Sequence, residues 1–128
     1  MIDPTERSIL IVDDDRFLLD MYSLKFKERG FAVHAALGSM EALERLQEGV
    51  RPDVVLLDIV MPAMDGFEFL EKVKKEHLTG EAKLIVLSNL GQQSDVDKAS
   101  RLGADGYIVK ASATPSEVVT KVLEVLGD

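Results

Sequence analysis

The sequence predicts an α/β protein built on a doubly wound, mostly parallel sheet. Five short apolar runs alternate along the chain with five segments of helical periodicity. Three of the runs, at residues 8–12, 53–57 and 83–87, are apolar at successive positions, which is typical of strands covered on both faces. With right-handed crossovers, this alternation winds into one sheet with helices on both faces.

The predicted strands are short, as strands of a small α/β sheet normally are. The first ends at a run of three aspartates, and the third, fourth and fifth each end at one polar or charged residue. The predicted bounds are residues 8–12, 31–35, 53–57, 83–87 and 106–109.

Helical periodicity and helix-end signals occupy the gaps between strands and the end of the chain. Gly30 supplies a stop for the first helix, and Ser39 is expected to cap the second. Thr114, Pro115 and Glu117 have the types expected at the start of the last helix, as a capping box with proline in the first turn. The predicted apolar stripes are Phe17, Met21 and Leu24, with Leu18 and Phe26 beside them; Met40, Leu43 and Leu46; Phe67, Leu70 and Val73; Val96, Ala99 and Leu102; and Val118, Val122, Leu123 and Leu126.

The composition narrows the classes of function. The 128 residues include 23 acidic and 15 basic side chains, for a net charge of −8. This balance argues against direct nucleic-acid binding, which needs a basic face, and suits a cation site or a basic partner. The chain has no cysteine, so disulfides, thiolate metal sites and a cysteine nucleophile are excluded.

We expect a single domain over residues 1–128, with no output domain in this chain. The polar, charged start does not have the pattern of a signal peptide, and the longest apolar runs are too short to span a bilayer. The expectation is a cytoplasmic protein that does not enter a membrane.

Unusual polar residues follow the predicted strands. Asp13 and Asp14 follow the first, Asp58 the third, Ser88 the fourth and Lys110 the fifth. In open α/β sheets, ligands bind at the carboxyl ends of the strands, near the point where strand order reverses. We therefore expect the three aspartates to converge at that edge.

Three neighbouring carboxylates remain ionised together only when a cation neutralises them. Oxygen ligands, with no cysteine and no nearby histidine, suit a hard cation, and an open site with few protein ligands favours Mg²⁺ over Ca²⁺. A carboxylate is also a competent nucleophile towards phosphorus. Taken singly, Asp14 or Asp15 could simply cap a helix, but the ordered set of polar residues favours a site.

Four stretches, at residues 9–15, 55–66, 87–88 and 106–110, resemble the signatures of bacterial two-component response-regulator receiver domains of the chemotaxis-receiver type. The resemblance covers nearly the whole chain, and the motifs occur in the family's order. It implies a flavodoxin-like (βα)5 fold with strand order 2-1-3-4-5. It also implies phosphorelay signal transduction, in which a sensor histidine kinase or a histidine phosphotransfer protein donates a phosphoryl group and a downstream effector reads the result.

For the metal and the acceptor, the resemblance implies four roles. Asp58 would be the phosphoacceptor. Asp14 and Asp58 would bind Mg²⁺ directly, together with the backbone carbonyl of Val60, while Asp13 would act mainly through bound water.

The resemblance implies catalytic roles for Lys110 and Ser88, and switch roles for Ser88 and Tyr107. Lys110 would pair with Asp58 and then with the phosphoryl group. Ser88 stands where the family has its switch hydroxyl, and Tyr107 stands at the aromatic position that moves inward. The resemblance further implies a phosphorylation-dependent homodimer through the face of the fourth helix, fifth strand and fifth helix.

The chain departs from the family's usual pattern at two positions. Ala111 follows the lysine where the family commonly has a proline with a cis bond, and Asn89 replaces a usually small residue beside the switch hydroxyl. The resemblance also implies that the positions two residues after the acceptor and two after the switch hydroxyl flank the approach of hydrolytic water. These positions hold the apolar Val60 and Leu90, which predicts a long-lived phosphorylated state.

The leading hypothesis is a signalling switch that catalyses only its own phosphorylation and dephosphorylation. One alternative is a Mg²⁺-dependent phosphohydrolase with an aspartyl nucleophile, but such enzymes usually carry an acid two residues after the nucleophile, where this chain has Val60. The other alternative is a receiver-like interaction module that is never phosphorylated. Retention of all five polar residues at the strand ends argues against it.

Overall fold

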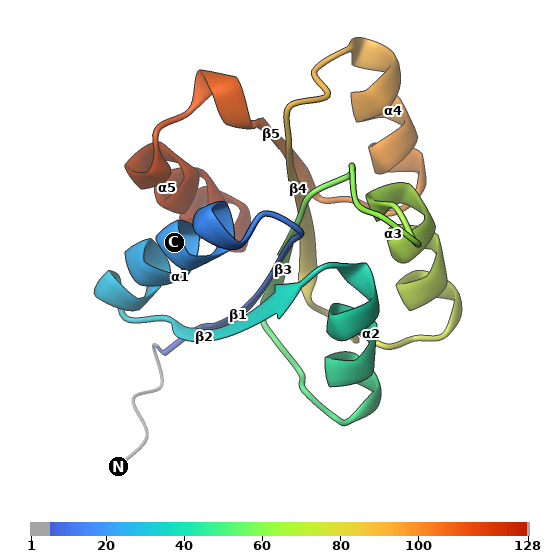
Figure 1. Ribbon diagram of the computed structural model, residues 1–128, viewed down its shortest axis with the longest axis horizontal. Coiled ribbons are helices and arrows are strands. Elements are labelled where there is room, and N and C mark those ends of the chain that lie inside the picture. The colour runs from blue at the N-terminus through green and yellow to red at the C-terminus, as the bar shows by residue number, and fades with distance from the viewer. Residues whose placement is uncertain (1–5, 128) are drawn as a thin grey trace.

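The computed structural model describes residues 6–127, in which five strands alternate with five α-helices (Figure 1). A 3₁₀ turn at Lys110–Ser112 precedes the last helix. The strands are β1 (Ser8–Asp13), β2 (Ala32–Leu37), β3 (Val54–Leu57), β4 (Lys83–Ser88) and β5 (Gly106–Val109). The helices are α1 (Arg16–Glu28), α2 (Ser39–Gln47), α3 (Gly66–Lys75), α4 (Gln93–Arg101) and α5 (Pro115–Leu126).

All strands pair in parallel, in the order β2-β1-β3-β4-β5. The predicted doubly wound sheet and its order are therefore confirmed. Because β1 lies between β2 and β3, the chain reverses its direction of winding there, and the ends of β1 and β3 are neighbours. Val12 pairs with Leu57 at the last step of that register, which places the residues following each strand side by side.

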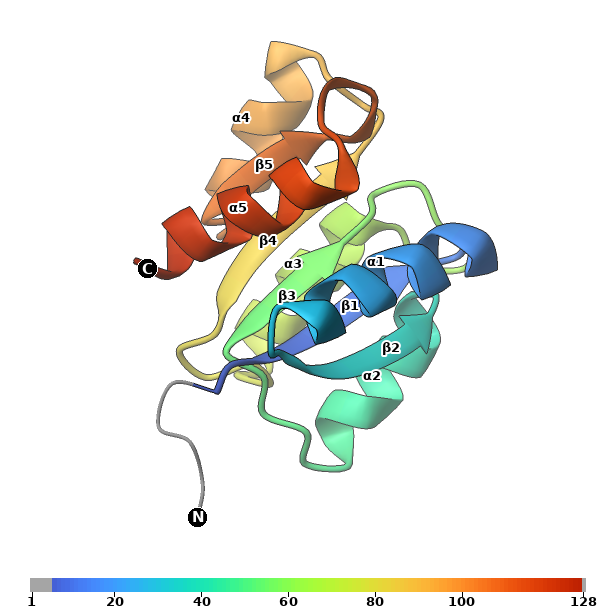
Figure 2. The same cartoon turned by 90° about the vertical axis from the view of Figure 1, so that its left-hand side faces the viewer.

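Two apolar layers enclose the sheet, one on each face. Helices α1 and α5 cover one face, and α2, α3 and α4 cover the other (Figure 2 views the sheet from the α1 and α5 side). Along β1, Ile9 and Ile11 enter the first layer, whereas Leu10 and Val12 enter the second. Burial on both faces explains why this strand is apolar at successive positions.

The face of α1 that packs on the sheet differs from the predicted face. Phe17 and Leu24 are 76% and 58% exposed, so their assignment to the core is wrong, while Met21 is half-buried. Of the two apolar residues expected beside the stripe, Phe26 is buried and Leu18 is half-buried, and Tyr22 is buried with Phe26. The Phe26 ring meets Phe31 edge to face at 5.0 Å, which ties the end of α1 to the start of the next strand.

The start of α2 also differs from the prediction. Gly38, with φ at 92°, occupies the N-cap position expected for Ser39. The buried Ser39 hydroxyl donates instead to the carbonyl of Met64, at 2.5 Å, and so joins α2 to the loop before α3. Met40 is exposed rather than in the core, whereas the predicted Leu43 and the rest of the α2 stripe are buried.

The remaining helices agree more closely with the prediction. The capping box of Thr114 and Glu117, with Pro115 in the first turn, is confirmed. Buried members of the predicted stripes are Leu46, Leu70, Val73, Ala99, Val118 and Val122, and half-buried ones are Phe67, Val96, Leu102, Leu123 and Leu126. Within residues 6–127, no helix has both the length and the apolar character needed to cross a membrane.

Candidate functional site

Three carboxylates meet at the carboxyl edge of the sheet. Oxygen atoms of Asp13, Asp14 and Asp58 all lie within 4.8 Å of one another. Asp13 and Asp58 are only 3% and 8% exposed, whereas Asp14 is exposed. The predicted convergence of these aspartates is confirmed, and the cluster is buried on one side and open on the other.

The sheet register places the two buried carboxylates. Asp13 is the last residue of β1, and the backbone N–H of Asp58 donates to the carbonyl of Val12 at 3.1 Å. One oxygen of each carboxylate accepts a backbone N–H: Asp13 from Asp15 at 2.9 Å and Asp58 from Ile59 at 2.6 Å. These hydrogen bonds fix the two carboxylates at the carboxyl ends of β1 and β3. The second oxygen of each carboxylate is left for another partner.

Lys110 supplies the cation that those second oxygens bind. Its Nζ donates to Oδ2 of Asp13 and to Oδ2 of Asp58, at 2.8 Å in each case, and its side chain is 9% exposed. Burial by itself lowers the pKa of this ammonium, but the hydrogen bonds to both carboxylates outweigh it and leave the pKa above its ordinary value. Lys110 therefore remains protonated at neutral pH.

Burial affects the pKa of Asp13 more than the neighbouring Lys110 ammonium does. Loss of solvent raises the pKa of the Asp13 carboxyl, and the hydrogen bond from Lys110 only partly opposes this. The nearby charge of Asp58 acts in the same direction as burial. A single ammonium thus does not fully compensate the acidic site, and further positive charge would be stabilising there.

The three consecutive aspartates, Asp13, Asp14 and Asp15, make different contacts. Asp15 is the N-cap of α1, because its side chain accepts from the backbone N–H of Leu18 at 3.1 Å. Asp14 points to the shared cluster and is exposed. Capping therefore belongs to Asp15, and Asp14 is free to contribute a ligand oxygen.

The loop after Asp58 is packed tightly under the start of α3. A Cβ at Gly66 would lie 2.4 Å from the carbonyl oxygen of Asp58 and 2.7 Å from Cα of Ile59, closer than any side chain permits. The Gly66 N–H donates to the carbonyl of Ile59 at 2.8 Å. Asp65 and Gly66 have the residue types of a turn that opens a helix, but nothing local in the sequence encodes this contact. Val60 lies in this loop, 61% exposed.

Ser88 and Tyr107 both hydrogen-bond to the backbone of Leu90, in the loop after β4. Ser88 is fully buried, and its Oγ accepts a long 3.3 Å hydrogen bond from the backbone N–H of Leu90. The Tyr107 hydroxyl donates to the carbonyl of the same Leu90. Burial, with smaller contributions from Asp95 and Asp58, raises the pKa of the Tyr107 phenol, so it stays a donor at neutral pH.

Asn89, which lies between Ser88 and Leu90 in the sequence, forms a hydrogen bond with the segment that follows β5. Its Oδ1 accepts from the backbone N–H of Ala111 at 3.1 Å. The Lys110–Ala111 peptide bond is trans. The two departures from the family pattern are therefore in contact with each other.

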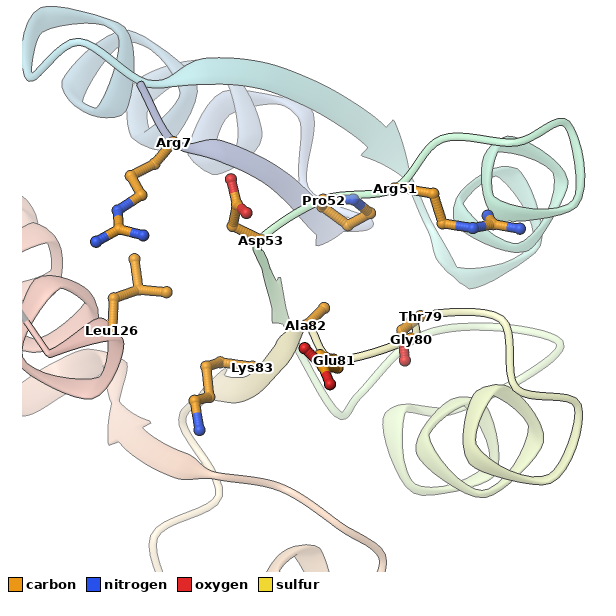
Figure 3. Close-up of a pocket in the computed structure, with 10 residues that line it drawn as sticks. All are labelled: Arg7, Arg51, Pro52, Asp53, Thr79, Gly80, Glu81, Ala82, Lys83 and Leu126. Carbon is orange, nitrogen blue, oxygen red and sulfur yellow. The ribbon is translucent and has the colours of Figure 1, made fainter. Parts of the chain in front are cut away.

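A hollow at the opposite end of the strands, lined in part by Asp53 and Lys83, lies away from this chemistry. It has a volume of about 410 Å³ and opens near the amino ends of β3 and β4 (Figure 3). Its charged lining is mixed: Asp53 and Glu81 stand among cations, and Asp53 already accepts from the backbone N–H of Ser8. Arg51 extends away from Asp53 and donates to backbone carbonyls at the end of α2. This hollow therefore contains none of the candidate site residues.

The acidic cluster has the chemistry of a hard-cation site. Its donor atoms are carboxylate oxygens from three residues, with no nitrogen or sulfur among them. The exposed side, at Asp14, leaves room for water and for an incoming oxygen ligand. The residues present therefore fit Mg²⁺.

Comparison with known proteins decides the family. The family model of the response regulator receiver domain matches residues 9–123. The chain belongs to this family. Receiver domains are signalling switches, and both the resemblance noted in the sequence and the flavodoxin-like fold it implied are confirmed.

Individual receiver proteins are similar over nearly the whole chain. The chemotaxis protein CheY of Halobacterium salinarum is 34% identical over 120 residues, covering 94% of this chain and 97% of that protein. A receiver domain protein of Methanospirillum hungatei is 32% identical with a TM-score of 0.86, covering 96% and 95% of the two chains. The chemotaxis response regulator CheY4 of Vibrio cholerae is 27% identical with a TM-score of 0.85, covering 94% and 99%.

Proposed function

We propose that this receiver domain is a phosphorylation switch whose acceptor is Asp58. The observation that carries the proposal is the position of the Asp58 carboxylate. It is buried beside Asp13 and Asp14, with one oxygen on a backbone N–H and the other on Lys110. A nucleophile held in this way needs little rearrangement to meet an incoming phosphorus atom.

In the proposed reaction, an oxygen of Asp58 attacks the phosphorus of a phosphohistidine on the donor protein. An O–P bond forms, the P–N bond breaks, and the departing imidazole keeps the electron pair and takes up a proton. The Lys110 ammonium then exchanges its bond with Asp58 for one to a phosphoryl oxygen. Its existing 2.8 Å contacts support this, because the ammonium already lies where the new charge would develop.

Asp14 and Asp58, with the carbonyl of Val60, are proposed to hold Mg²⁺ directly, and Asp13 is proposed to hold it through water. When bound, Mg²⁺ supplies positive charge that offsets the crowded carboxylates and the phosphoryl oxygens. The raised pKa of Asp13 supports this assignment, since Lys110 alone leaves the cluster short of positive charge.

The phosphoryl group is proposed to recruit the Ser88 hydroxyl. Among residues 6–127, the hydrogen bond to that hydroxyl is a long one, 3.3 Å from the Leu90 N–H, so little is lost when the hydroxyl rotates. A hollow of about 200 Å³ between α4 and β5 is lined in part by Tyr107. Movement of the loop after β4 would therefore reshape a surface that an effector can read.

The proposed partners are a sensor histidine kinase or a histidine phosphotransfer protein as donor, and an effector protein as reader. An aspartyl phosphate added to a chain of net charge −8 suits donors and readers that present basic groups near the site. We propose no metabolic reaction for the domain beyond its own phosphorylation and dephosphorylation.

The test is phosphorylation by acetyl phosphate with Mg²⁺, followed by intact mass. Wild type should gain the mass of one phosphate, Asp58→Asn should gain none, and Asp20→Asn, an exposed aspartate on α1, should match wild type. Full labelling of Asp58→Asn would refute the acceptor assignment. Steady turnover of a generic phosphate ester would instead favour the phosphohydrolase alternative.

A further inference from the structure

Asn89 extends the contact between β4 and β5 beyond their last backbone pair. That pair is Ser88 with Val109, so Asn89 and Lys110 are the next residues on the two strands. The side chain of Asn89 reaches the segment that follows β5, where its Oδ1 accepts a hydrogen bond from the N–H of Ala111 at 3.1 Å. A side chain here takes the place of a ladder hydrogen bond.

The segment that Asn89 holds has weak support of its own. It forms a 3₁₀ turn over Lys110–Ser112, in which the Ala113 N–H reaches the Lys110 carbonyl at 3.4 Å, near the limit for a hydrogen bond. Ala111 and Ser112 are exposed. The bond to Asn89 is the shorter of these two restraints, and it acts on the residue that follows Lys110.

The bond depends on the residue type at both ends. Proline at position 111 would have no N–H to donate, and a small apolar residue at position 89 would have no acceptor. Asn89 and Ala111 are the two positions at which this chain departs from the usual receiver pattern, and they complement each other.

The loop that carries Asn89 is itself tied to β5. The next residue, Leu90, accepts the Tyr107 hydroxyl at its carbonyl. The loop after β4 is thus attached before Lys110, through Tyr107, and after Lys110, through Ala111. The backbone that presents the Lys110 ammonium is held on both sides by one loop.

We infer that Asn89 is a positioning residue, which holds the backbone at Ala111 so that the Lys110 ammonium stays between Asp13 and Asp58 for phosphoryl transfer. The inference rests on the proposed function. Without the bond, the turn after Lys110 moves more freely and the ammonium spends less time in the arrangement that meets the phosphoryl group. The expected loss is about 2- to 10-fold in phosphorylation rate, the equivalent of one net hydrogen bond.

The experiment compares wild type with Asn89→Leu and Asn89→Ala. Leucine is close to asparagine in size but has no acceptor, so it separates the hydrogen bond from the space that the side chain fills. Labelling by acetyl phosphate at saturating Mg²⁺ should slow by a similar factor in both variants. If Asn89 acts instead by narrowing the entrance, Asn89→Leu should match wild type and Asn89→Ala should be faster, which would overturn the inference.

Two further measurements exclude a merely structural effect. The Ala111 amide should exchange with solvent faster in both variants, and in Asn89→Asp, which keeps an acceptor, its protection should return. Mg²⁺ affinity should stay at the wild-type value, because the three carboxylates are untouched. Unchanged exchange at Ala111, or unchanged labelling rates in both variants, would overturn the inference alone; absence of label on wild type would overturn the proposed function and the inference with it.

Discussion

Lys110 and Asp58 are 52 positions apart in the chain, yet Nζ of the lysine lies 2.8 Å from Oδ2 of the aspartate. The same ammonium is equally close to Asp13, so one buried cation serves two buried carboxylates. Such an arrangement is costly to break from one side, because the partners left behind remain buried and unpaired. We therefore propose that Lys110 contributes both to the stability of the site and to its chemistry.

Lys110→Met should reduce phosphorylation by acetyl phosphate by about 100-fold, since a preorganised charge at the phosphoryl oxygens is lost. Without Mg²⁺, the free energy of unfolding should fall by about 3 kcal/mol, because Asp13 and Asp58 lose their shared partner. Labelling kinetics and denaturant titration measure the two effects. Lys121→Met, at an exposed position on α5, is the control, and equal behaviour of the two variants would refute the role of Lys110.

Asp14→Ala should weaken Mg²⁺ binding about tenfold or more, because one of few protein ligands is removed. Isothermal titration calorimetry would measure the change. Asp15→Ala is a closely matched control: it removes the N-cap of α1, which should cost about 1 kcal/mol of stability but leave Mg²⁺ affinity intact. Wild-type affinity in Asp14→Ala would contradict its assignment as a ligand.

Asp13→Asn should make the metal-free protein more stable than wild type at neutral pH. The raised pKa of Asp13 means that folding disfavours its ionised form, so wild type gains stability as pH falls through the folded-state pKa towards the ordinary carboxyl value. The advantage of the variant should shrink over that pH range. Melting temperatures of wild type and variant, measured in the presence of a chelator between pH 4.5 and 8, would test this. Asp20→Asn is the control. A stability difference between Asp13→Asn and wild type that does not change with pH would refute the prediction.

The phosphorylated state should be long-lived, because Val60 and Leu90 offer no side-chain hydrogen bond to the water that attacks the phosphorus. Val60 is exposed and Leu90 half-buried, so both are available to shield the acceptor. The decay of label should be slower in wild type than in a Val60→Asn, Leu90→Glu double variant. Decay in wild type that is as fast as in the variant would show that this explanation is wrong.

Phosphorylation should favour self-association through the face of α4, β5 and α5. Sedimentation with and without beryllofluoride, which mimics the phosphoryl group, would detect the larger species. Asp58→Asn should remain monomeric under both conditions. Identical sedimentation of wild type with and without the mimic would count against the dimer.

The sheet and its acidic edge were predictable because their signals are local. Strands buried on both faces are apolar at every position, and the aspartates directly follow two of them. The order of the sheet then brings Asp13 and Asp58 together without further information. Roles carried over from the family, such as the Val60 carbonyl as a ligand, stay predictions.

The rotation of α1 was not predictable from spacing alone. Its sequence supports two overlapping apolar stripes, one through Phe17 and Leu24 and one through Leu19, Tyr22 and Phe26. The choice depends on how the helix meets the sheet, where Phe26 packs on Phe31. Ser39 is a similar case, because the carbonyl that draws its hydroxyl away from the helix end belongs to Met64, 25 positions further along.

The order of residues in the acidic site also has a consequence for synthesis on the ribosome. Asp13, Asp14 and Asp58 are translated well before Lys110, and β5 is the last strand to join the sheet. A nascent chain that has produced β1 and β3 therefore carries the mutual repulsion of these carboxylates without its own neutralising lysine. Until Lys110 has been translated, these carboxylates can be neutralised only by a cation from solution, such as the Mg²⁺ proposed for the site.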